Sequence, residues 1–563
     1  MNLRKHQSDL SKIIDRIISG DPVRTIICRV TPGGGKSALP IIAGRLIAAG
    51  LADGICWVCP RRSLQYQGER NFQDPFFREA IGHRLSVRAS TNEPDPCRGL
   101  NGFITTYQAI GLDEAGTVLE AFRRRRFILV CDEFHHVELD WVWHKALAPI
   151  AEAAKYVLLL SGTLERGDGK QIAFTPYLPN RIGHIPFLRN TTDTRIIEYS
   201  RSDALQERAI IPLKFFLNDG HAEWQDEGGN TVNMSLSKSG HEASRAIYTA
   251  LSTEYAEDLL GLAFDHWIKH RQAVPTSKLL VVTASLQHAK AAVEWMKGRW
   301  AASEIATSHE SDAAHEAIKR FKDGGLDILV SIAMASEGLD VPEVDHMAIL
   351  THIRSTPWIE QCVCRAVRIN RAAGPWEDQC GFIFAPDDPL FREIVRKIEA
   401  EQLPIARKSR ALAGDGEQLE LFDEPKKDGE KRLNFIPLSS RLTGRRELSL
   451  GGNGGGVAPV YQMPLPKTPS EIEQELRDQI EEHVRAYSFR NRKTPYDLNK
   501  ALFDRYQKPR AEMTTPELEM VLRYLRQSYP QTYTRGTGRQ RVPTKAKAVE
   551  VEWDQREAER FYL

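Results

Sequence analysis

Short apolar runs alternate with longer helical patterns through the first part of the chain. Such runs stand at 24–30, 54–60, 102–108, 127–133 and 156–163. The first is followed by a glycine-rich turn and by KSALPIIAGRLIAAG (36–50), for which we predict one helix. Strands that are apolar throughout and alternate with helices indicate a parallel sheet covered on both faces. We therefore predict an α/β domain over 1–200.

The same alternation begins again later in the chain. Strands are predicted at 278–285, 326–332, 346–353 and 380–386, and helices at 286–300 and 317–325. This predicts a second α/β domain over 276–408. The connecting region, 201–275, contains the strand candidate IIPLKFFL and the helix EYAEDLLGLAFDHWIKHR.

The composition changes after the second domain. Glycines and mixed charges predict a flexible linker over 409–468. Helical patterns predict a small, mostly helical accessory domain over 469–530, followed by a basic tail over 531–563. The segment RAYSFRNRKTPYDLNKALFDRYQKPR interleaves cations with Tyr and Phe. That pattern fits nucleic-acid binding, a small helical bundle with an aromatic core, or partner docking.

Length and composition limit the classes of protein to which this chain can belong. The 563 residues are too many for one core, and 41% hydrophobic with 27% charged residues is typical of soluble domains. No apolar run is long enough to span a bilayer, and the N-terminus lacks a signal-peptide pattern, so we expect no membrane partner and a cytoplasmic protein. Eight cysteines without a framework suit a reducing compartment. Cys56 and Cys59 should point to opposite faces of a strand, which argues against a zinc site.

TPGGGKSA (31–38) lies between the first strand and the first helix. Glycines let backbone N–H groups converge on phosphate oxygens, and the helix directs its positive end at the same anion. We expect Lys36 to reach the β- and γ-phosphates of a nucleotide and Ser37 to bind Mg²⁺. Thr31 stands where a strict phosphate-loop pattern has Gly or Ala. The remaining nucleotide-binding residues expected here are Thr31, Pro32, Gly33, Gly34, Gly35 and Ala38.

LVCDEFHHVEL (129–139) places two carboxylates beside two histidines. Asp132, Glu133, His135 and His136 could form a metal cage or the water-activating corner of an ATPase. The segment ends an apolar strand, and ligands of parallel sheets bind at the carboxyl ends of strands. With a phosphate loop upstream, we favour the second interpretation. Asp132 would then hold Mg²⁺, and Glu133 would polarise the attacking water.

The segment DEFH resembles motif II of the superfamily 2 helicases, the DEAD/DEAH-box proteins. Segments resembling the other motifs occur in order along about residues 1–390. They are LRKHQ (3–7), CPRRSLQYQ (59–67, motif Ia), ITTYQ (104–108, motif Ib), SGT (161–163, motif III), VTASLQHA (282–289, motif IV), SEGLDVPEV (336–344, motif V) and IEQCVCRAVR (359–368, motif VI). The chain is most similar to the branch with type III restriction enzyme motor subunits and phage or repair helicases.

The resemblance implies two tandem RecA-like P-loop domains, ATP and Mg²⁺ as cofactors, and a set of site residues. Arg4 and Gln7 would contact nucleotide, as would Gly338 and Asp340. Arg365 and Arg368 would be arginine fingers, with Gln361 as a polar partner. Nucleic-acid contacts would come from Arg61, Arg62, Gln65, Thr105, Thr106 and Gln108, and His135, Ser161 and Thr163 would couple the two activities. The family glycine of motif VI is replaced by Cys364, which puts the finger geometry in doubt.

These features predict an ATP-dependent nucleic-acid motor, a helicase or translocase that prefers DNA. One alternative is the motor subunit of a restriction or defence complex, with a separate nuclease or methyltransferase partner. Another is an ATP-switched nucleic-acid clamp that does not unwind. The best carboxylate cluster for a nuclease, APDDPLFREIVRK (385–397), lacks the strand-borne Glu-x-Lys of such a site, so we expect no nuclease in this chain.

Overall fold

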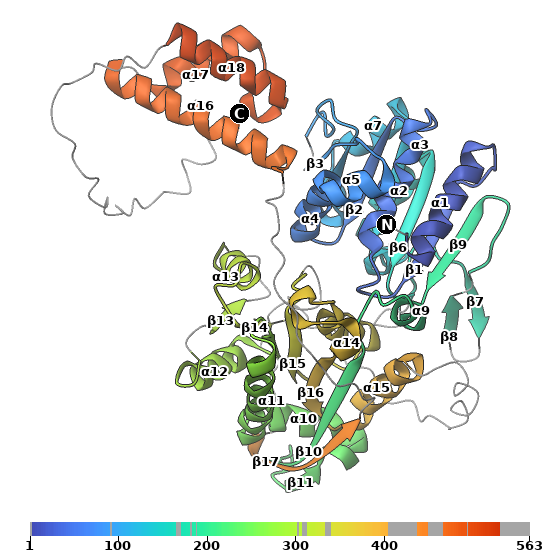
Figure 1. Ribbon diagram of the computed structural model, residues 1–563, viewed down its shortest axis with the longest axis vertical. Coiled ribbons are helices and arrows are strands. Elements are labelled where there is room, and N and C mark those ends of the chain that lie inside the picture. The colour runs from blue at the N-terminus through green and yellow to red at the C-terminus, as the bar shows by residue number, and fades with distance from the viewer. Residues whose placement is uncertain are drawn as a thin grey trace. The chain divides into compact units, whose positions relative to one another are not determined.

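The computed structural model describes residues 3–90, 93–164, 170–180, 183–186, 188–300, 303–306, 312–332, 339–402, 436–448, 466–491 and 494–529. Described residues up to Gln206 form a first lobe, and those from Leu213 to Leu448 form a second (Figure 1). The α/β architecture expected from the alternation of apolar runs is confirmed in both lobes.

Parallel strands build the seven-stranded sheet of the first lobe, in the order β3-β4-β2-β5-β6-β1-β9. The strands are β1 (Thr25–Val30), β2 (Gly54–Cys59), β3 (Val87–Ala89), β4 (Gly102–Thr106), β5 (Phe127–Asp132), β6 (Tyr156–Ser161) and β9 (Thr194–Tyr199). A separate hairpin pairs β7 (Tyr177–Asn180) with β8 (Gly183–Pro186). Because β5, β6 and β1 are neighbours, the loops that follow their carboxyl ends meet at one edge of the sheet.

Helices cover both faces of this sheet (Figure 1). They are α1 (Lys5–Ile18), α2 (Leu39–Ala43), α3 (Arg45–Ala48), α4 (Arg62–Gln73), α5 (Pro75–Ile81), α6 (Tyr107–Gly111), α7 (Thr117–Arg124), α8 (Val142–Ala153) and α9 (Arg201–Gln206). Side chains of α1, α2 and α4 share one core with Cys59, whereas those of α6, α7 and α8 share another with Cys56. The two cysteines therefore lie on opposite faces of β2, as predicted, and cannot share a zinc ion.

The second lobe has an eight-stranded mixed sheet that contains the path β11-β10-β16-β15-β12-β14-β13. Its strands are β10 (Leu213–Gln225), β11 (Thr231–Ser235), β12 (Lys278–Thr283), β13 (Ser303–Ala306), β14 (Ile328–Ile332), β15 (Val344–Leu350), β16 (Gly381–Pro386) and β17 (Ile436–Leu448). Its helices are α10 (Ala243–Leu251), α11 (Glu254–Ala273), α12 (Leu286–Lys297), α13 (Asp312–Lys322), α14 (Thr356–Val363) and α15 (Pro389–Gln402). The strands between β10 and β13 on this path pair in parallel.

Two predicted boundaries differ from the structure. The connecting region, 201–275, is largely part of the second lobe, because β10 pairs with β16 and α10 and α11 pack on the same sheet. The predicted linker, 409–468, contains β17, which pairs antiparallel with β10 over Phe215–Gln225 (Figure 1). Ile436, Leu438 and Leu442 stand at even-numbered positions in this segment, which is an incomplete form of the period of two that indicates a strand. Residues 409–435 and 449–465 of that prediction lie outside the described residues, as do residues 403–408 of the predicted second domain.

The helix predicted over 36–50 is broken into shorter pieces. A 3-10 turn (Lys36–Ala38) leads into α2, and α3 begins after Gly44. Pro40 occupies the first turn of α2, where its missing N–H is tolerated. A Cβ atom on Gly44 would lie 2.3 Å from the Leu85 side chain, so the close packing of this segment requires glycine.

The C-terminal helices are α16 (Pro469–Asn491), α17 (Pro495–Tyr506) and α18 (Thr515–Ser528). The accessory domain predicted over 469–530 is divided between two compact units: 469–474 and 511–514 belong to the unit of the lobes, and 475–510 and 515–529 to the other. Within the second unit, Leu498, Leu502, Leu518 and Leu525 are buried, which is the packing of a helical bundle. The predicted basic tail, 531–563, lies outside the described residues.

Candidate functional site

The glycine-rich loop follows β1 and has a backbone that requires glycine. Gly33 and Gly35 have φ angles of 82° and 91°, in the left-handed region that other residues adopt only with strain. A Cβ atom on Gly34 would lie 2.8 Å from the Thr31 carbonyl oxygen. Such a turn, directly before a helical segment, leaves backbone N–H groups available to an anion.

Lys36 and Glu133 form an ion pair at the carboxyl ends of β1 and β5. Glu133 has a φ of 47°, an uncommon value for a residue with a side chain, and its carboxylate also accepts a hydrogen bond from the Gly162 N–H at 3.3 Å. Burial acts to raise the pKa of Glu133, but Lys36 and His135 outweigh it and hold the pKa well below its usual range. The loop lysine and the candidate water-activating carboxylate are therefore already in contact.

Asp132 is the last residue of β5 and is 9% exposed. Burial raises the pKa of Asp132 to about 7, against the opposing charge of Lys36, and Glu133 adds to the rise. The charge of Lys36 does not fully offset the burial of this carboxylate, and a bound cation would supply the remaining positive charge. Asp132 and Ser37 fit Mg²⁺, which takes one or two protein oxygens together with phosphates and water.

The competing interpretation of this segment as a metal cage is not supported. Glu133 turns to Lys36, and His135 turns to Ser161. Across the portion of the chain that the structure describes, no group of three or more His, Cys, Asp or Glu is placed to hold a metal ion.

A chain of hydrogen bonds joins the two lobes through His135. Burial, with help from His136, lowers the pKa of His135 to about 4, so the ring is neutral near pH 7. Gln361 Nε2 lies 3.1 Å from His135 Nε2, and His135 Nδ1 lies 2.9 Å from Ser161 Oγ. With Gln361 as donor, Nδ1 carries the ring hydrogen and donates it to Ser161, whose hydroxyl donates to the Thr163 carbonyl. The three predicted coupling residues thus form one chain of hydrogen bonds, and His135 joins that chain directly to Gln361, the predicted polar partner in motif VI.

Residues upstream of the first strand also reach the loop. Arg4 donates to the Gly34 carbonyl at 2.7 Å, and Gln7 donates to the Gly35 carbonyl at 3.2 Å. Burial lowers the pKa of Arg4, and the positive charge of Arg368 contributes to the decrease. The structure therefore brings Arg4, Gln7 and Arg368 to the loop that the sequence assigned to nucleotide.

The second lobe contacts the loop through the 3-10 turn Cys364–Val367. A Cβ atom on Gly33 would lie 3.0 Å from the Val367 side chain, so the lobes approach closely here. Arg365 donates to the Leu339 carbonyl at 3.1 Å, and Arg368 lies 3.4 Å from the Asp340 carboxylate. Both candidate fingers are thus engaged within their own lobe, and Gly338 lies outside the described residues.

Cys364, which replaces the family glycine, is buried and accepts a hydrogen bond from the Arg201 guanidinium, with 3.3 Å between Nη2 and Sγ. The substitution thus ties motif VI to α9, next to the last strand of the first lobe.

Two family models match this chain. The family described as type III restriction enzyme, res subunit, matches residues 1–166, and the helicase conserved C-terminal domain matches residues 262–370. The two matched regions are helicase domains of superfamily 2. The first of them is of the branch of the type III restriction enzyme subunits. The matched regions carry the phosphate loop and motif II in one lobe and motif VI in the other.

Relatives of this helicase-type chain include proteins of known and unknown role. An uncharacterized protein of Mycobacterium tuberculosis is 24% identical over 392 residues, which are 68% of this chain and 62% of that protein. UvrABC system protein B of Synechococcus is 26% identical over 194 residues, 33% of this chain and 26% of that protein. A structure described as a type I restriction enzyme HsdR subunit from Vibrio vulnificus aligns at 13% identity and a TM-score of 0.45, covering 69% of this chain and 65% of that one. The chain spans less than two thirds of the Mycobacterium tuberculosis relative.

The residues predicted to contact nucleic acid fall into two groups. Arg62 and Gln108 are exposed, and Arg61 is half-buried at the start of α4. The other three are buried: Gln65, Thr105 and Thr106. Gln65 donates to the carbonyls of Ser90 and Ile104, and Thr106 caps α6. These buried side chains therefore support the elements that carry the exposed residues.

Sequence reasoning missed Tyr107, which links motif Ib to motif II. Its ring is buried and stacks on Trp143 with 5.7 Å between centroids, and its hydroxyl donates to the Asp132 carbonyl at 2.9 Å. The signal available was a tyrosine directly after the capping Thr106, since a buried tyrosine hydroxyl usually finds a partner.

The carboxylates considered for a nuclease are held by arginines. Asp388 pairs with Arg354 at 2.9 Å, with both side chains fully buried, and Asp387 pairs with Arg392. A metal site would need these oxygens for the ion. Asp387 and Asp388 are thus paired with arginines and are not arranged as a metal site.

Within the described residues, no helix is both long enough and apolar enough to cross a bilayer.

Proposed function

We propose that this chain hydrolyses ATP with Mg²⁺ between its two lobes, is stimulated by nucleic acid, and moves along or unwinds it, with DNA preferred. The observation that carries the proposal is the contact of Lys36 with Glu133, at a loop whose glycines have left-handed backbones. A lysine and a carboxylate at this position suit phosphate binding and water activation. The family matches support the same chemistry.

Lys36 and Glu133 have separate roles in the proposed hydrolysis. Lys36 leaves Glu133 to bind the terminal phosphates, which removes a cause of the low pKa of Glu133 and makes this carboxylate a better base. Glu133 then accepts a proton from the attacking water, while the Gly162 N–H keeps the carboxylate in place. Lys36 thus controls when Glu133 becomes active.

Asp132 and Ser37 would hold the magnesium ion. When bound, Mg²⁺ neutralises charge on the phosphates during transfer. The raised pKa of Asp132 supports this assignment, because a cation would stabilise the ionised form. Asp132 stays aligned because its backbone carbonyl is held by Tyr107 and its Oδ1 accepts the Glu133 N–H at 3.0 Å.

Arg365 and Arg368 remain the candidates for arginine fingers. Each would have to exchange its present partner, the Leu339 carbonyl or Asp340, for phosphate oxygens. Closure of the lobes would allow each arginine to change partners. The bond between Gln361 and His135 would transmit this movement to motif III.

Nucleic acid would lie across the surface of Arg61, Arg62 and Gln108. These side chains are exposed or half-buried and suit phosphate contacts without base readout. The preference for DNA rests on the restriction-enzyme family and on UvrABC system protein B among the relatives.

ATP hydrolysis by the full chain with single-stranded DNA, duplex, forked DNA and RNA tests the proposal. We expect stimulation by DNA that is lost in Lys36→Ala and Glu133→Gln, while Arg371→Ala, an exposed control, keeps the wild-type rate. Robust hydrolysis by either site variant would refute the assignment. A strand-displacement assay separates a motor from an ATP-switched clamp, and a nuclease or methyltransferase recovered in stoichiometric amount from native cells would indicate a defence complex.

A further inference from the structure

Glu473, near the start of α16, lies buried between two arginines of the first lobe. The Nε and Nη2 atoms of Arg88 donate hydrogen bonds to the two carboxylate oxygens of Glu473, at 3.3 and 3.2 Å. Arg98 Nη1 donates to Glu473 Oε2 at 2.8 Å. Glu473, Arg88 and Arg98 are only 2%, 4% and 6% exposed. Removing one partner from such a set leaves uncompensated charge away from water, which is costly.

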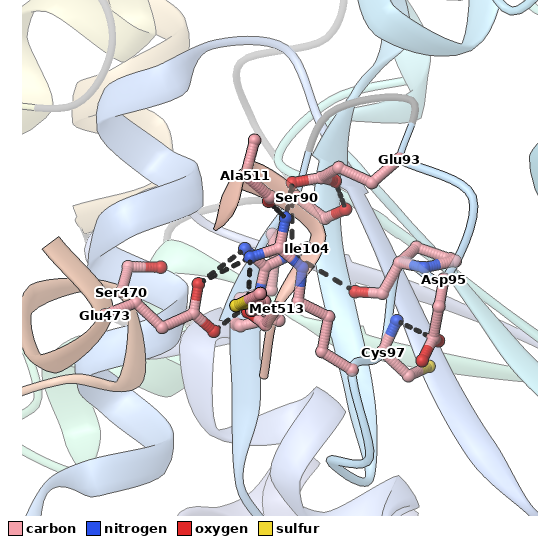
Figure 2. A network of polar contacts seen from close by, with 12 residues as sticks. Ser90, Glu93, Asp95, Cys97, Ile104, Ser470, Glu473, Ala511 and Met513 are labelled. Atoms are coloured by element: carbon pink, nitrogen blue, oxygen red, sulfur yellow. Dashed lines mark hydrogen bonds and ion pairs between the residues drawn. The ribbon is translucent and has the colours of Figure 1, made fainter. Parts of the chain in front are cut away.

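Glu93 completes the charge balance of this network, and a second C-terminal segment joins it (Figure 2). Glu93 accepts from both arginines, at 3.3 Å from Arg88 and 3.4 Å from Arg98. Arg98 also donates to the backbone carbonyls of Ala511 and Met513. Arg98 has a φ of 44°, a strained backbone for an arginine, and its many contacts offset that strain. Two segments distant in sequence, 469–474 and 511–514, are thus fixed to the same arginine.

The network continues into α4, the helix that begins after Arg61. Glu93 accepts from the Ser90 hydroxyl, and the Ser90 carbonyl accepts from Gln65 at 2.7 Å. One turn further along α4, the buried Glu69 carboxylate accepts the Ser470 N–H at 2.8 Å. A carboxylate at the N-terminus of α16 is stabilised by the helix dipole. Two consecutive turns of α4 are therefore joined to the C-terminal segments, one directly and one through the network.

We propose that the C-terminal segments 469–474 and 511–514 hold α4 in the orientation in which Arg61 and Arg62 meet nucleic acid, with Glu473 as the positioning residue. This inference rests on the proposed nucleic-acid-stimulated ATPase. Neither family model covers these segments, and they add a function to a region that the motor motifs leave unassigned. The Glu473 side chain binds Arg88 and Arg98, so it acts on α4 through these two arginines.

The test compares Glu473→Gln with two controls in the full chain. Glu482→Gln changes an exposed carboxylate on the same helix, and Glu120→Gln breaks a solvent-exposed pair with Arg124 on α7. We measure basal ATP hydrolysis, the oligothymidylate concentration that half-maximally stimulates it, and oligothymidylate binding by fluorescence anisotropy. We expect Glu473→Gln to raise the half-stimulating concentration about tenfold with unchanged basal rate. Both controls should behave as wild type.

A second comparison distinguishes a loss of α4 positioning from general damage to the fold. In a chain that already carries Arg61→Ala and Arg62→Ala, Glu473→Gln should weaken binding no further, because the contacts that it positions are gone. Additive losses, or an unchanged half-stimulating concentration in Glu473→Gln alone, would overturn the inference. If Glu473→Gln does not fold, Arg98→Lys keeps the charge but loses the guanidinium fork, and the same result is expected of it.

The outcomes also distinguish this inference from the proposed function. A wild-type chain that no nucleic acid stimulates contradicts both. A wild-type chain that DNA stimulates, with an unaltered Glu473→Gln variant, contradicts the positioning role alone.

Discussion

Gln361 Nε2, in the second lobe, lies 3.1 Å from His135 Nε2, in the first. Both side chains are buried, at 7% and 5% exposure, so the bond is shielded from water. The neutral histidine can accept this bond only while its ring hydrogen is on Nδ1, the nitrogen that faces Ser161 and Glu133. A change in the spacing of the lobes must therefore alter the hydrogen bonding of motifs II and III.

Replacing Gln361 by alanine should reduce nucleic-acid-stimulated ATP turnover about tenfold, because the link between the lobes is lost. Steady-state hydrolysis at saturating DNA measures the effect. Arg371→Ala, at a nearby exposed position, serves as the control. Wild-type turnover in Gln361→Ala would show that the bond does not couple the lobes.

Replacing Tyr107 by phenylalanine removes the hydroxyl that donates to the Asp132 carbonyl and keeps the stacked ring. The loss should lower the free energy of unfolding by about 1 kcal/mol, the usual contribution of such a bond. Stimulated hydrolysis should fall as well, because Asp132 is less firmly held. Urea unfolding and ATPase assays check both effects. Tyr66→Phe, at a residue 51% exposed, should change neither.

Stability should fall as the pH is lowered from about 6.5 toward 4, because burial holds the pKa of His6 at about 4 in the folded chain. The unfolded chain binds a proton near pH 6.5, and the folded chain binds it only near 4, so acid favours unfolding throughout this window. For His6 alone, the loss between pH 7 and 5.5 is about 1 kcal/mol.

Urea unfolding of His6→Gln across this pH range checks the sign and the size. The variant should show a shallower dependence on pH than the wild type, whereas His221→Gln, at a half-buried position on β10, should retain the full slope. An identical slope in His6→Gln would exclude His6 as a contributor.

Breaking the buried pair of Arg354 and Asp388 should strongly destabilise the second lobe. Asp388→Asn leaves a fully buried guanidinium without its counter-charge, which costs about 3 kcal/mol or more. Asp53→Asn removes the partner of Arg126 on the surface and should cost less than about 1 kcal/mol. Thermal unfolding of both variants makes the comparison, and equal shifts would contradict it.

The features predictable from sequence were those encoded by neighbouring residues. Apolar runs marked the strands of both sheets, and the loop around Lys36 and the segment around Glu133 could be assigned because each lies at the end of such a run. Pairing between distant segments was not predictable. Nothing near Glu473 indicates that its partners are Arg88 and Arg98, because a buried charge is recognised only once its surroundings are known.

Gln65 illustrates a different limit. Its place in a motif suggested a direct contact with nucleic acid, yet its amide is satisfied by the carbonyls of Ser90 and Ile104. A motif identifies a residue that matters without telling whether it touches the ligand or supports the residues that do. Pro40 and Gly44 interrupt the helix predicted over 36–50. The long apolar pattern of this segment nevertheless favoured a single helix.

Strand β17 occupies one whole side of β10, because β11 and β16 pair with its other side. A chain shortened to the predicted domain end at 408 would leave that side of β10 without hydrogen-bond partners over Phe215–Gln225. An open edge of this length recruits strands from other molecules. Shortened forms of this protein should therefore self-associate unless they extend through Leu448, because β17 covers the edge of β10 that would otherwise pair with another molecule.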